Sequence, residues 1–161
     1  MGMNVMDEKK QRMIQKEEEI TNGSGIWSGY LIGNDPDNEY SVKYLRRAAE
    51  KICSNRIKWS DIIVLYSDST FGEGKSGFAL STDGIYVNTM LNKDSKFSIK
   101  YSDIDFVYRD TTEDKPFLKI YTRYGDCKII DHPWFNKKVL CELIDALKEI
   151  AVENDDIKLE W

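Results

Sequence analysis

From residue 61 onward the apolar residues recur at every second position, or in short runs bounded by turn residues, which is the period of β-strands. The alternation is clearest where Phe97, Ile99 and Tyr101 share one face and lysine or serine occupies the other. The first of these segments, residues 62–66, is instead an unbroken apolar run, which is typical of a strand buried on both faces. The pattern predicts seven strands, at 62–66, 77–82, 85–90, 96–101, 104–108, 117–122 and 126–130.

Two glycine-containing pairs between these strands predict β-hairpins. Asp83-Gly84 separates the second and third strands, and such a pair tolerates the positive backbone angles of a tight turn. Tyr124-Gly125 separates the last two strands and predicts a second hairpin. Local connections of this kind favour antiparallel pairing over a parallel, doubly wound sheet.

Helices rather than strands are expected in three other segments, 7–20, 39–54 and 136–152. In 39–54, Val42, Leu45 and Ala49 fall on one face with basic residues on the other, and Asn38 is placed to cap the start.

The final helix is expected at 136–152, where apolar residues recur at every third or fourth position after Asn136 as N-cap. In 7–20 the only apolar spot is Met13 with Ile14, so we expect a helix that is frayed or ordered only against a partner.

A glycine-rich segment at 21–37 joins the first two helices. Its four glycines and one proline indicate a loop, but it also holds large apolar side chains, including Trp27 and Tyr30. Two alternatives stay open for these side chains. They are buried against the rest of the chain, or they form a contact surface for another chain.

Together these elements predict an α+β fold: a seven-stranded antiparallel bent sheet or small barrel, closed at one end by the C-terminal helix. We expect an N-terminal helical and glycine-rich extension at 1–57, a β-domain with its helix at 58–152, and an acidic tail at 153–161. The chain has 161 residues, of which 41% are hydrophobic, enough to build a core. No apolar run approaches the length of a membrane span, and we expect a cytoplasmic protein.

Charge and cysteine content narrow the function classes. A net charge of −5 argues against nucleic acid as the main partner. The three cysteines, Cys53, Cys127 and Cys141, have no CxxC spacing, and the only histidine is His132. We therefore expect reduced thiols, no metal site and no cofactor.

The two kinds of charge are also separated along the chain. Residues 43–58 are predominantly basic, whereas the last part, from Glu142 to Glu160, is predominantly acidic. The segments are either two solvated helix faces or mutually attractive surfaces, within one chain or between subunits.

The segment Gly74-Lys75-Ser76 matches the end of a phosphate-binding loop, which requires G-x-x-x-x-G-K-[ST] followed by a helix. The first glycine of that motif falls at Ser69, and Gly77 with its short apolar run leads into the predicted hairpin instead of a helix. We therefore expect a β-hairpin here, and a nucleotide-binding enzyme is only a remote alternative.

The order "strand, Asp-x-Thr-Phe-Gly, Gly-Lys-x-Gly, short strand, Thr-x-Gly-Ile-Tyr, strand" resembles bacterial pleckstrin-homology-like domains of largely unassigned function. The resemblance covers about 58–152 and implies a seven-stranded fold with a C-terminal helix. In lipid-binding members of the wider superfamily the first loop carries several basic residues. Here Lys75 lies beside Asp68 and Glu73, which argues against phosphoinositide binding. The matching residues are Asp68, Thr70, Phe71, Gly72, Gly74, Lys75, Gly77, Thr82, Gly84, Ile85 and Tyr86.

We expect a non-enzymatic protein-binding or regulatory module, because no catalytic constellation is encoded. A second copy of the chain is an alternative partner. A different alternative is an acidic inhibitor, or immunity protein, that neutralises a basic toxin enzyme through its acidic end. Large amphipathic side chains dominate contact energies. The candidate partner-binding residues are Trp27, Tyr30, Asp68, Phe71 and Lys75.

Overall fold

Helices and antiparallel strands confirm the α+β class. The structure is a computed structural model that describes residues 5–23, 31–67, 76–88, 96–109, 117–131 and 137–157. The helices are α1 (Val5–Gly23), α2 (Glu39–Lys51) and α3 (Lys137–Ile157). The strands are β1 (Leu31–Gly33), β2 (Ile62–Ser67), β3 (Gly77–Ser81), β4 (Gly84–Asn88), β5 (Lys96–Lys100), β6 (Ile104–Arg109), β7 (Phe117–Thr122) and β8 (Cys127–Asp131). Two short 3-10 helices, η1 (Trp59–Asp61) and η3 (Tyr101–Asp103), precede β2 and β6.

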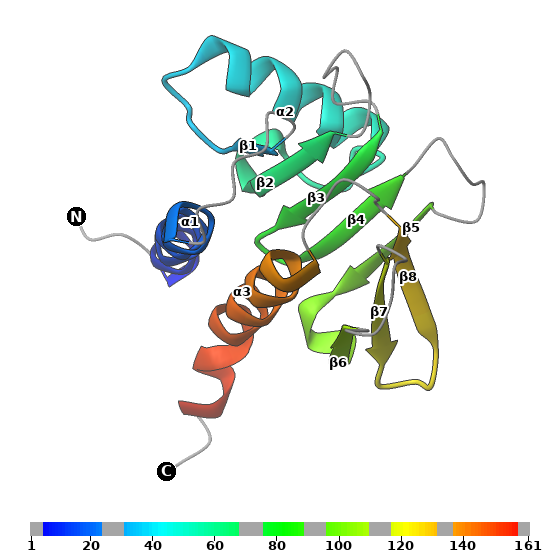
Figure 1. Cartoon of the computed structure of the whole chain (residues 1–161). Helices are drawn as coiled ribbons and strands as arrows, with labels where there is room; N and C mark the ends of the chain where they lie inside the picture. The colour runs from blue at the N-terminus through cyan, green and yellow to red at the C-terminus, as the bar shows by residue number, and fades with distance from the viewer. Residues whose placement is uncertain are drawn as a thin grey trace.

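The strands form two separate sheets (Figure 1), and each follows chain order: β1-β2-β3-β4-β5 in one and β6-β7-β8 in the other. Every pairing is antiparallel. The expectation of one bent seven-stranded sheet or barrel is therefore wrong. The described strands form two sheets that do not close into a barrel, and the chain passes from one sheet to the other through η3. The additional strand, β1, lies in the glycine-rich segment that was expected to be a loop.

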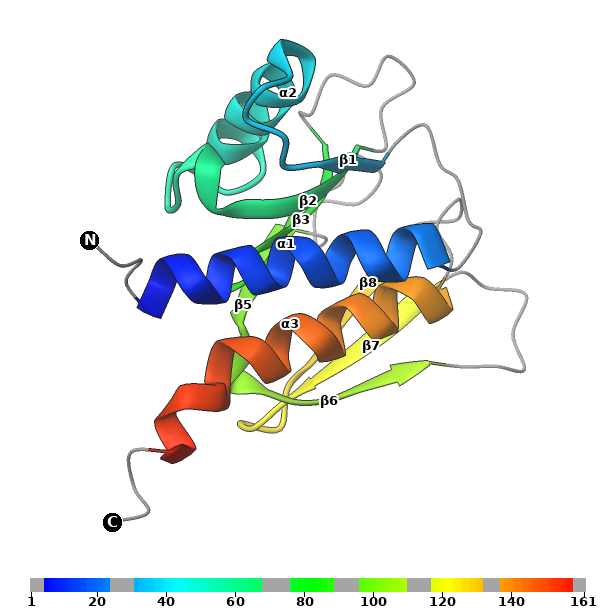
Figure 2. The same cartoon turned by 90° about the vertical axis from the view of Figure 1, so that its left-hand side faces the viewer.

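The main core lies between the two sheets and is covered by α1 and α3, which lie side by side and antiparallel (Figure 2). Its largest fully buried side chains include Tyr66, Phe78 and Tyr101. The rings of Tyr66 and Phe78 stack with centroids 5.1 Å apart. The α3 stripe contributes Leu143, among other apolar residues, because their spacing places them on one face.

A second apolar cluster lies on the opposite face of the five-stranded sheet, beneath α2. Leu45 and Ala48 of α2 pack there against Leu65 of β2 and Ala79 of β3. Both faces of β2 are consequently covered, and all its residues are buried, which confirms the prediction from its unbroken apolar run.

The start of α2 is capped as its sequence predicts. The side-chain oxygen of Asn38 accepts hydrogen bonds from the backbone amides of Tyr40 and Ser41, at 2.9 and 3.3 Å. This satisfies two amide groups that have no partner within the helix. The predicted cap of α3, Asn136, lies outside the described residues.

The described parts of the extension predicted at 1–57 pack against the rest of the molecule. Met13 of α1 is 1% exposed and belongs to the main core. Strand β1 pairs with β2, with Ile32 opposite Leu65. The helix α3 continues to Ile157, past the start of the predicted tail at 153. The boundaries at 57/58 and 152/153 stay predictions.

Candidate functional site

The five residues predicted to contact a partner, Trp27, Tyr30, Asp68, Phe71 and Lys75, lie outside the described residues. The described chain resumes at Ser76, which is buried. Strand β3 begins at Gly77, as the hairpin prediction requires, whereas a phosphate-binding loop would need a helix there. The geometry around Ser76 therefore gives no support to nucleotide binding.

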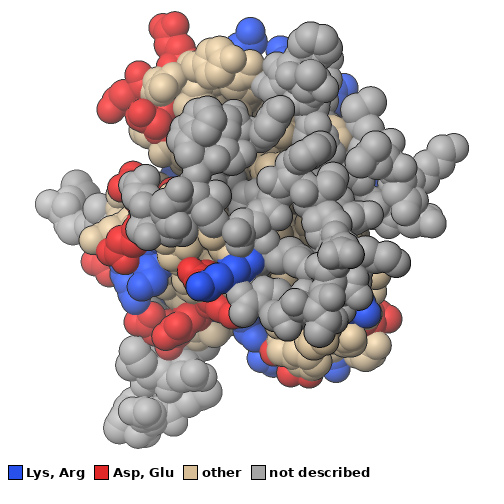
Figure 3. All heavy atoms as spheres, viewed as in Figure 1, with Lys and Arg blue, Asp and Glu red and all other residues tan. Residues whose placement is uncertain are grey.

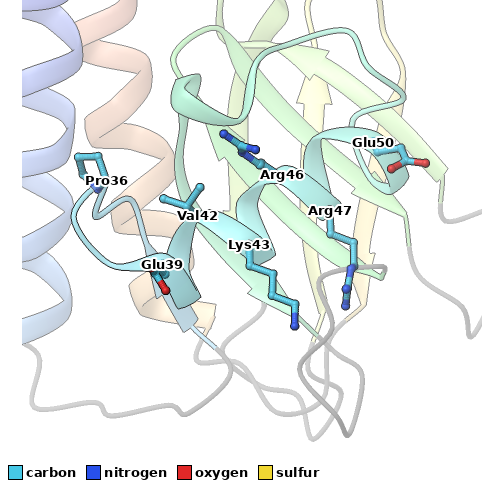
Figure 4. A pocket seen from close by; sticks show the side chains of 7 residues that line it. All are labelled: Pro36, Glu39, Val42, Lys43, Arg46, Arg47 and Glu50. Carbon is cyan, nitrogen blue, oxygen red and sulfur yellow. The ribbon is translucent and has the colours of Figure 1, made fainter.

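A concave surface with three basic side chains runs along the outer face of α2 (Figure 4). We call it the α2 groove. It encloses about 630 Å³, and Figure 4 shows Lys43 and Arg47 extending to the same side of the helix. The helix places these residues together because positions three and four apart share a face. The lining residues are Pro36, Glu39, Val42, Lys43, Arg46, Arg47 and Glu50.

Aromatic side chains outside the lining of the α2 groove lie close to it in the chain or contact one of its residues. The guanidinium of Arg46 lies 5.6 Å from the ring centroid of Trp59, within range of a cation–π interaction. Tyr40, at the start of α2, is 65% exposed, and its ring packs edge-on against Tyr44. Tyrosine, tryptophan and arginine are the residue types that dominate binding energy at protein interfaces.

The acidic C-terminal part does not neutralise the groove in the described structure. Instead Arg12 of α1 donates a bidentate pair of hydrogen bonds to Glu153 of α3, at 2.8 and 3.1 Å. The hydrogen bond from Arg12 lowers the pKa of Glu153. Lys9 donates to the backbone oxygen of Ala151, at 2.7 Å. Figure 3 shows acidic and basic side chains next to each other on the side of the molecule where α1 lies.

The three cysteines lie in different surroundings. Burial, followed by repulsion from Asp83, raises the pKa of Cys53 to about 12, so its thiol stays protonated at neutral pH. Cys127 is exposed, and the thiol of Cys141 lies 3.7 Å from a carboxylate oxygen of Asp145. Within the described part of the chain, no group of His, Cys, Asp and Glu side chains is suited to hold a metal ion.

The sequence pattern did not indicate that Glu17 is a buried ionisable residue. Glu17 of α1 is only 7% exposed, and a pocket of about 460 Å³ opens beside it. Glu17 follows the buried Met13 by four residues, which places both on one face of α1. That spacing is the signal that could have identified it, but the surrounding run of glutamates made the position resemble solvated surface.

Comparisons with protein-family models, with curated proteins and with solved structures found no match to this chain. Among the described helices, none has the length and apolar character that crossing a membrane requires.

Proposed function

We propose that this chain is a non-catalytic protein-binding module, and that its α2 groove holds an acidic segment of the partner. The observation that carries the proposal is the groove of about 630 Å³ with Lys43, Arg46 and Arg47 on a rigid helix. Helix α2 is anchored by the buried cluster beneath it, so the cations are held in place before a partner arrives.

The mixed lining favours a protein segment over nucleic acid. Pro36 and Val42 supply apolar surface, and the acidic side chains Glu39 and Glu50 lie among the cations. Nucleic acid binds through many phosphate contacts, and a chain with a net charge of −5 disfavours them. A peptide with acidic and apolar side chains can match both features.

The proposal is tested by photo-crosslinking in a lysate of the source organism, with the crosslinking amino acid in place of Glu39. Both Lys43 and Arg46 are exposed, so Lys43→Glu with Arg46→Glu reverses the charge without opening the core. We expect wild-type protein to crosslink to peptides of net negative charge, and the double variant to lose these crosslinks. Raising the ionic strength should weaken them, since exposed charges are screened.

The matched control carries Arg123→Glu with Lys128→Glu, an equal change in charge at exposed positions of the β7–β8 hairpin. It should keep the crosslinks of the wild type. Crosslinks that persist in the α2 double variant, or that join the groove to RNA or lipid, would contradict the proposal.

We further propose that β2 to β8 with α3 form a pleckstrin-homology-like domain, to which β1, α1 and α2 are added. The support is the order of the elements: the seven expected strands occur in sequence and α3 packs on the core that they enclose. An experimental structure that superposes these strands and α3 on such a domain would verify this, and a different strand order would contradict it.

The two alternatives stay predictions without added support. The acidic inhibitor requires a free acidic end, whereas Glu153 is paired with Arg12. The nucleotide-binding enzyme requires a helix after Ser76, where the structure has a strand.

A further inference from the structure

A pocket of about 460 Å³ lies between α1, the end of β1 and the start of α2, and we call it the Glu17 pocket. The carboxyl of Glu17 faces the backbone of β1. An added Cβ at Gly33 would lie 3.7 and 3.8 Å from its two oxygens, an ordinary van der Waals separation, so the carboxylate lies directly beside this strand. The pocket has the volume of a small-molecule or side-chain site.

The described lining of the pocket is acidic and includes no counter-ion. Three carboxylates line it, from Glu17, Glu18 and Asp35, and no Lys, Arg or His is among its described lining residues. No Lys or Arg of the described chain forms an ion pair with Glu17. Residues 24–30, which link α1 to β1, contain neither Lys nor Arg. Figure 3 shows acidic side chains along the left-hand edge of the molecule, from the start of α2 down to α1.

The remaining polar groups of the pocket favour a hydrogen-bond donor as ligand. The side-chain amide of Asn34 donates hydrogen bonds to the backbone oxygens of Ser60 and Ile62, at 3.1 and 2.7 Å. Its side-chain carbonyl oxygen can therefore act only as an acceptor for a ligand. The hydroxyl of Ser41 donates to the backbone oxygen of Gly33, at 2.8 Å. Ile14 and Ile32 add apolar wall, which suits the methylene groups of an alkyl chain.

We propose that the Glu17 pocket binds an organic cation, a primary ammonium or a guanidinium group, with Glu17 as its counter-ion. A buried carboxylate is costly unless it is paired, and a ligand that brings both a positive charge and N–H donors supplies what the pocket lacks. A metal ion fits less well, because no metal-holding group of side chains is present in the described chain. The inference uses a different surface from the α2 groove and does not depend on it.

The state of Glu17 without ligand makes binding pH-dependent. Burial, followed by repulsion from Glu18, raises its pKa from 4.5 to about 7, and a hydrogen bond from Thr21 opposes the shift. The other titratable side chains that face the pocket are Asp35 beside β1 and Tyr40 on α2. A cation binds the ionised carboxylate, so its affinity should fall about tenfold between about pH 8 and pH 6 as Glu17 takes up a proton.

The test is isothermal titration calorimetry of the full chain at about pH 8, with n-butylammonium as probe and tetramethylammonium, which has no N–H donor, at matched ionic strength. Of these two cations, we expect n-butylammonium to bind and tetramethylammonium not to bind. Spermidine and the peptide acetyl-Gly-Lys-Gly-amide, run in parallel, distinguish a free amine from a lysine side chain of a polypeptide. Equal binding of tetramethylammonium, or no binding of any ammonium or guanidinium probe, would overturn the proposal.

Two variants on α1 keep the test specific. Glu17→Gln retains the shape of the protonated side chain and should weaken binding by at least about tenfold, because the charged hydrogen bond is lost. Glu19→Gln, at an exposed position on the same helix, should bind as the wild type does. Equal affinity of wild type and Glu17→Gln would refute the role of Glu17.

A second readout does not require a ligand. Folded Glu17 holds its proton up to about pH 7, and the unfolded chain releases it near pH 4.5. This contribution to stability is therefore fully present below pH 4.5 and is lost as the pH rises to about 7. In a plot of melting temperature against pH, Glu17→Gln should abolish this loss of stability. In the wild type, added n-butylammonium should offset the same loss. An unchanged profile in Glu17→Gln would show that the carboxyl is not buried as described.

Discussion

Gly84 shows, at the scale of one residue, how a correct hairpin prediction can rest on the wrong reason. The pairing of Leu80 with Ile85 makes Thr82 and Asp83 the turn residues, and neither has a positive φ. Gly84 is the first residue of β4 and lies opposite Lys100 of β5. An added Cβ there would lie 2.2 Å from the backbone oxygen of Ile99. The glycine is required for the close approach of two strands, which local sequence does not reveal.

The turn itself is organised by a hydroxyl group. Ser81 accepts hydrogen bonds from the backbone amides of Asp83 and Gly84, at 3.1 and 3.0 Å, and the carboxylate of Asp83 accepts one from the Ser81 hydroxyl at 2.6 Å. Gly125, in contrast, does have a positive φ of 88°, and nothing lies within 4 Å of an added Cβ. The second hairpin was thus predicted for the right reason.

We predict that Gly84→Ala lowers the free energy of unfolding by at least about 2 kcal/mol, because β4 and β5 must separate to admit the methyl group. Gly125→Ala is the matched control. It should cost about 1 kcal/mol, since only its backbone conformation is disfavoured. Urea unfolding measures both, and equal losses would contradict the close-approach argument.

At the scale of elements, strands β2 and β6 begin in the same way. Residues 58–62 (KWSDI) and 100–104 (KYSDI) each form a 3-10 turn that leads into a strand, β2 or β6. The backbone oxygen of Asp61 accepts a hydrogen bond from Thr82, at 2.9 Å, and that of Asp103 accepts one from Arg123, at 3.0 Å. A similar local sequence therefore produces a similar turn in two places.

Helix α1 is the element whose role the sequence least revealed. Its single apolar spot, Met13 with Ile14, predicted a helix that is frayed or ordered only against a partner. The helix packs within the chain instead, against α3 and the edge of the main core. Most helical stability in proteins comes from tertiary packing, which the period of one segment alone does not show.

We predict that Met13→Ala lowers the free energy of unfolding by about 2–4 kcal/mol, because it leaves a cavity beneath a helix that is otherwise weakly apolar. Gln15→Ala, at an exposed position on α1, should leave stability within about 0.5 kcal/mol of the wild type. Chemical denaturation followed by circular dichroism makes the comparison. A negligible effect of Met13→Ala would mean that α1 is not docked.

At the scale of the whole molecule, the five-stranded sheet joins the two apolar clusters, because β2, β3 and β4 contribute side chains to both of its faces. Tyr101 connects the turn between the sheets to the first hairpin. Its hydroxyl donates to the backbone oxygen of Ser81, at 2.7 Å, and burial raises its pKa well above the usual value. Neither cluster is complete without the shared strands.

We predict a single cooperative unfolding transition in which both clusters melt together. Leu45 of α2 and Leu143 of α3 are each 0% exposed. Leu45→Ala and Leu143→Ala should each lower the midpoint of that one transition, at a cost of about 2–5 kcal/mol. Tryptophan fluorescence and far-ultraviolet circular dichroism should coincide in both variants. Two separate transitions would show that α2 and its cluster form an independent unit.

The sequence by itself determined the three helices, the seven strands from 62 onward and the antiparallel pairing, because period and turn chemistry are local properties. It also placed the basic residues of α2 on one face. Only the tertiary structure decided that Leu31–Gly33 adds a strand to β2, that the strands divide into two sheets, and that Glu17 lies buried beside a pocket. These features depend on contacts between segments far apart in the chain, and burial is a property of such contacts rather than of any residue's neighbours in sequence.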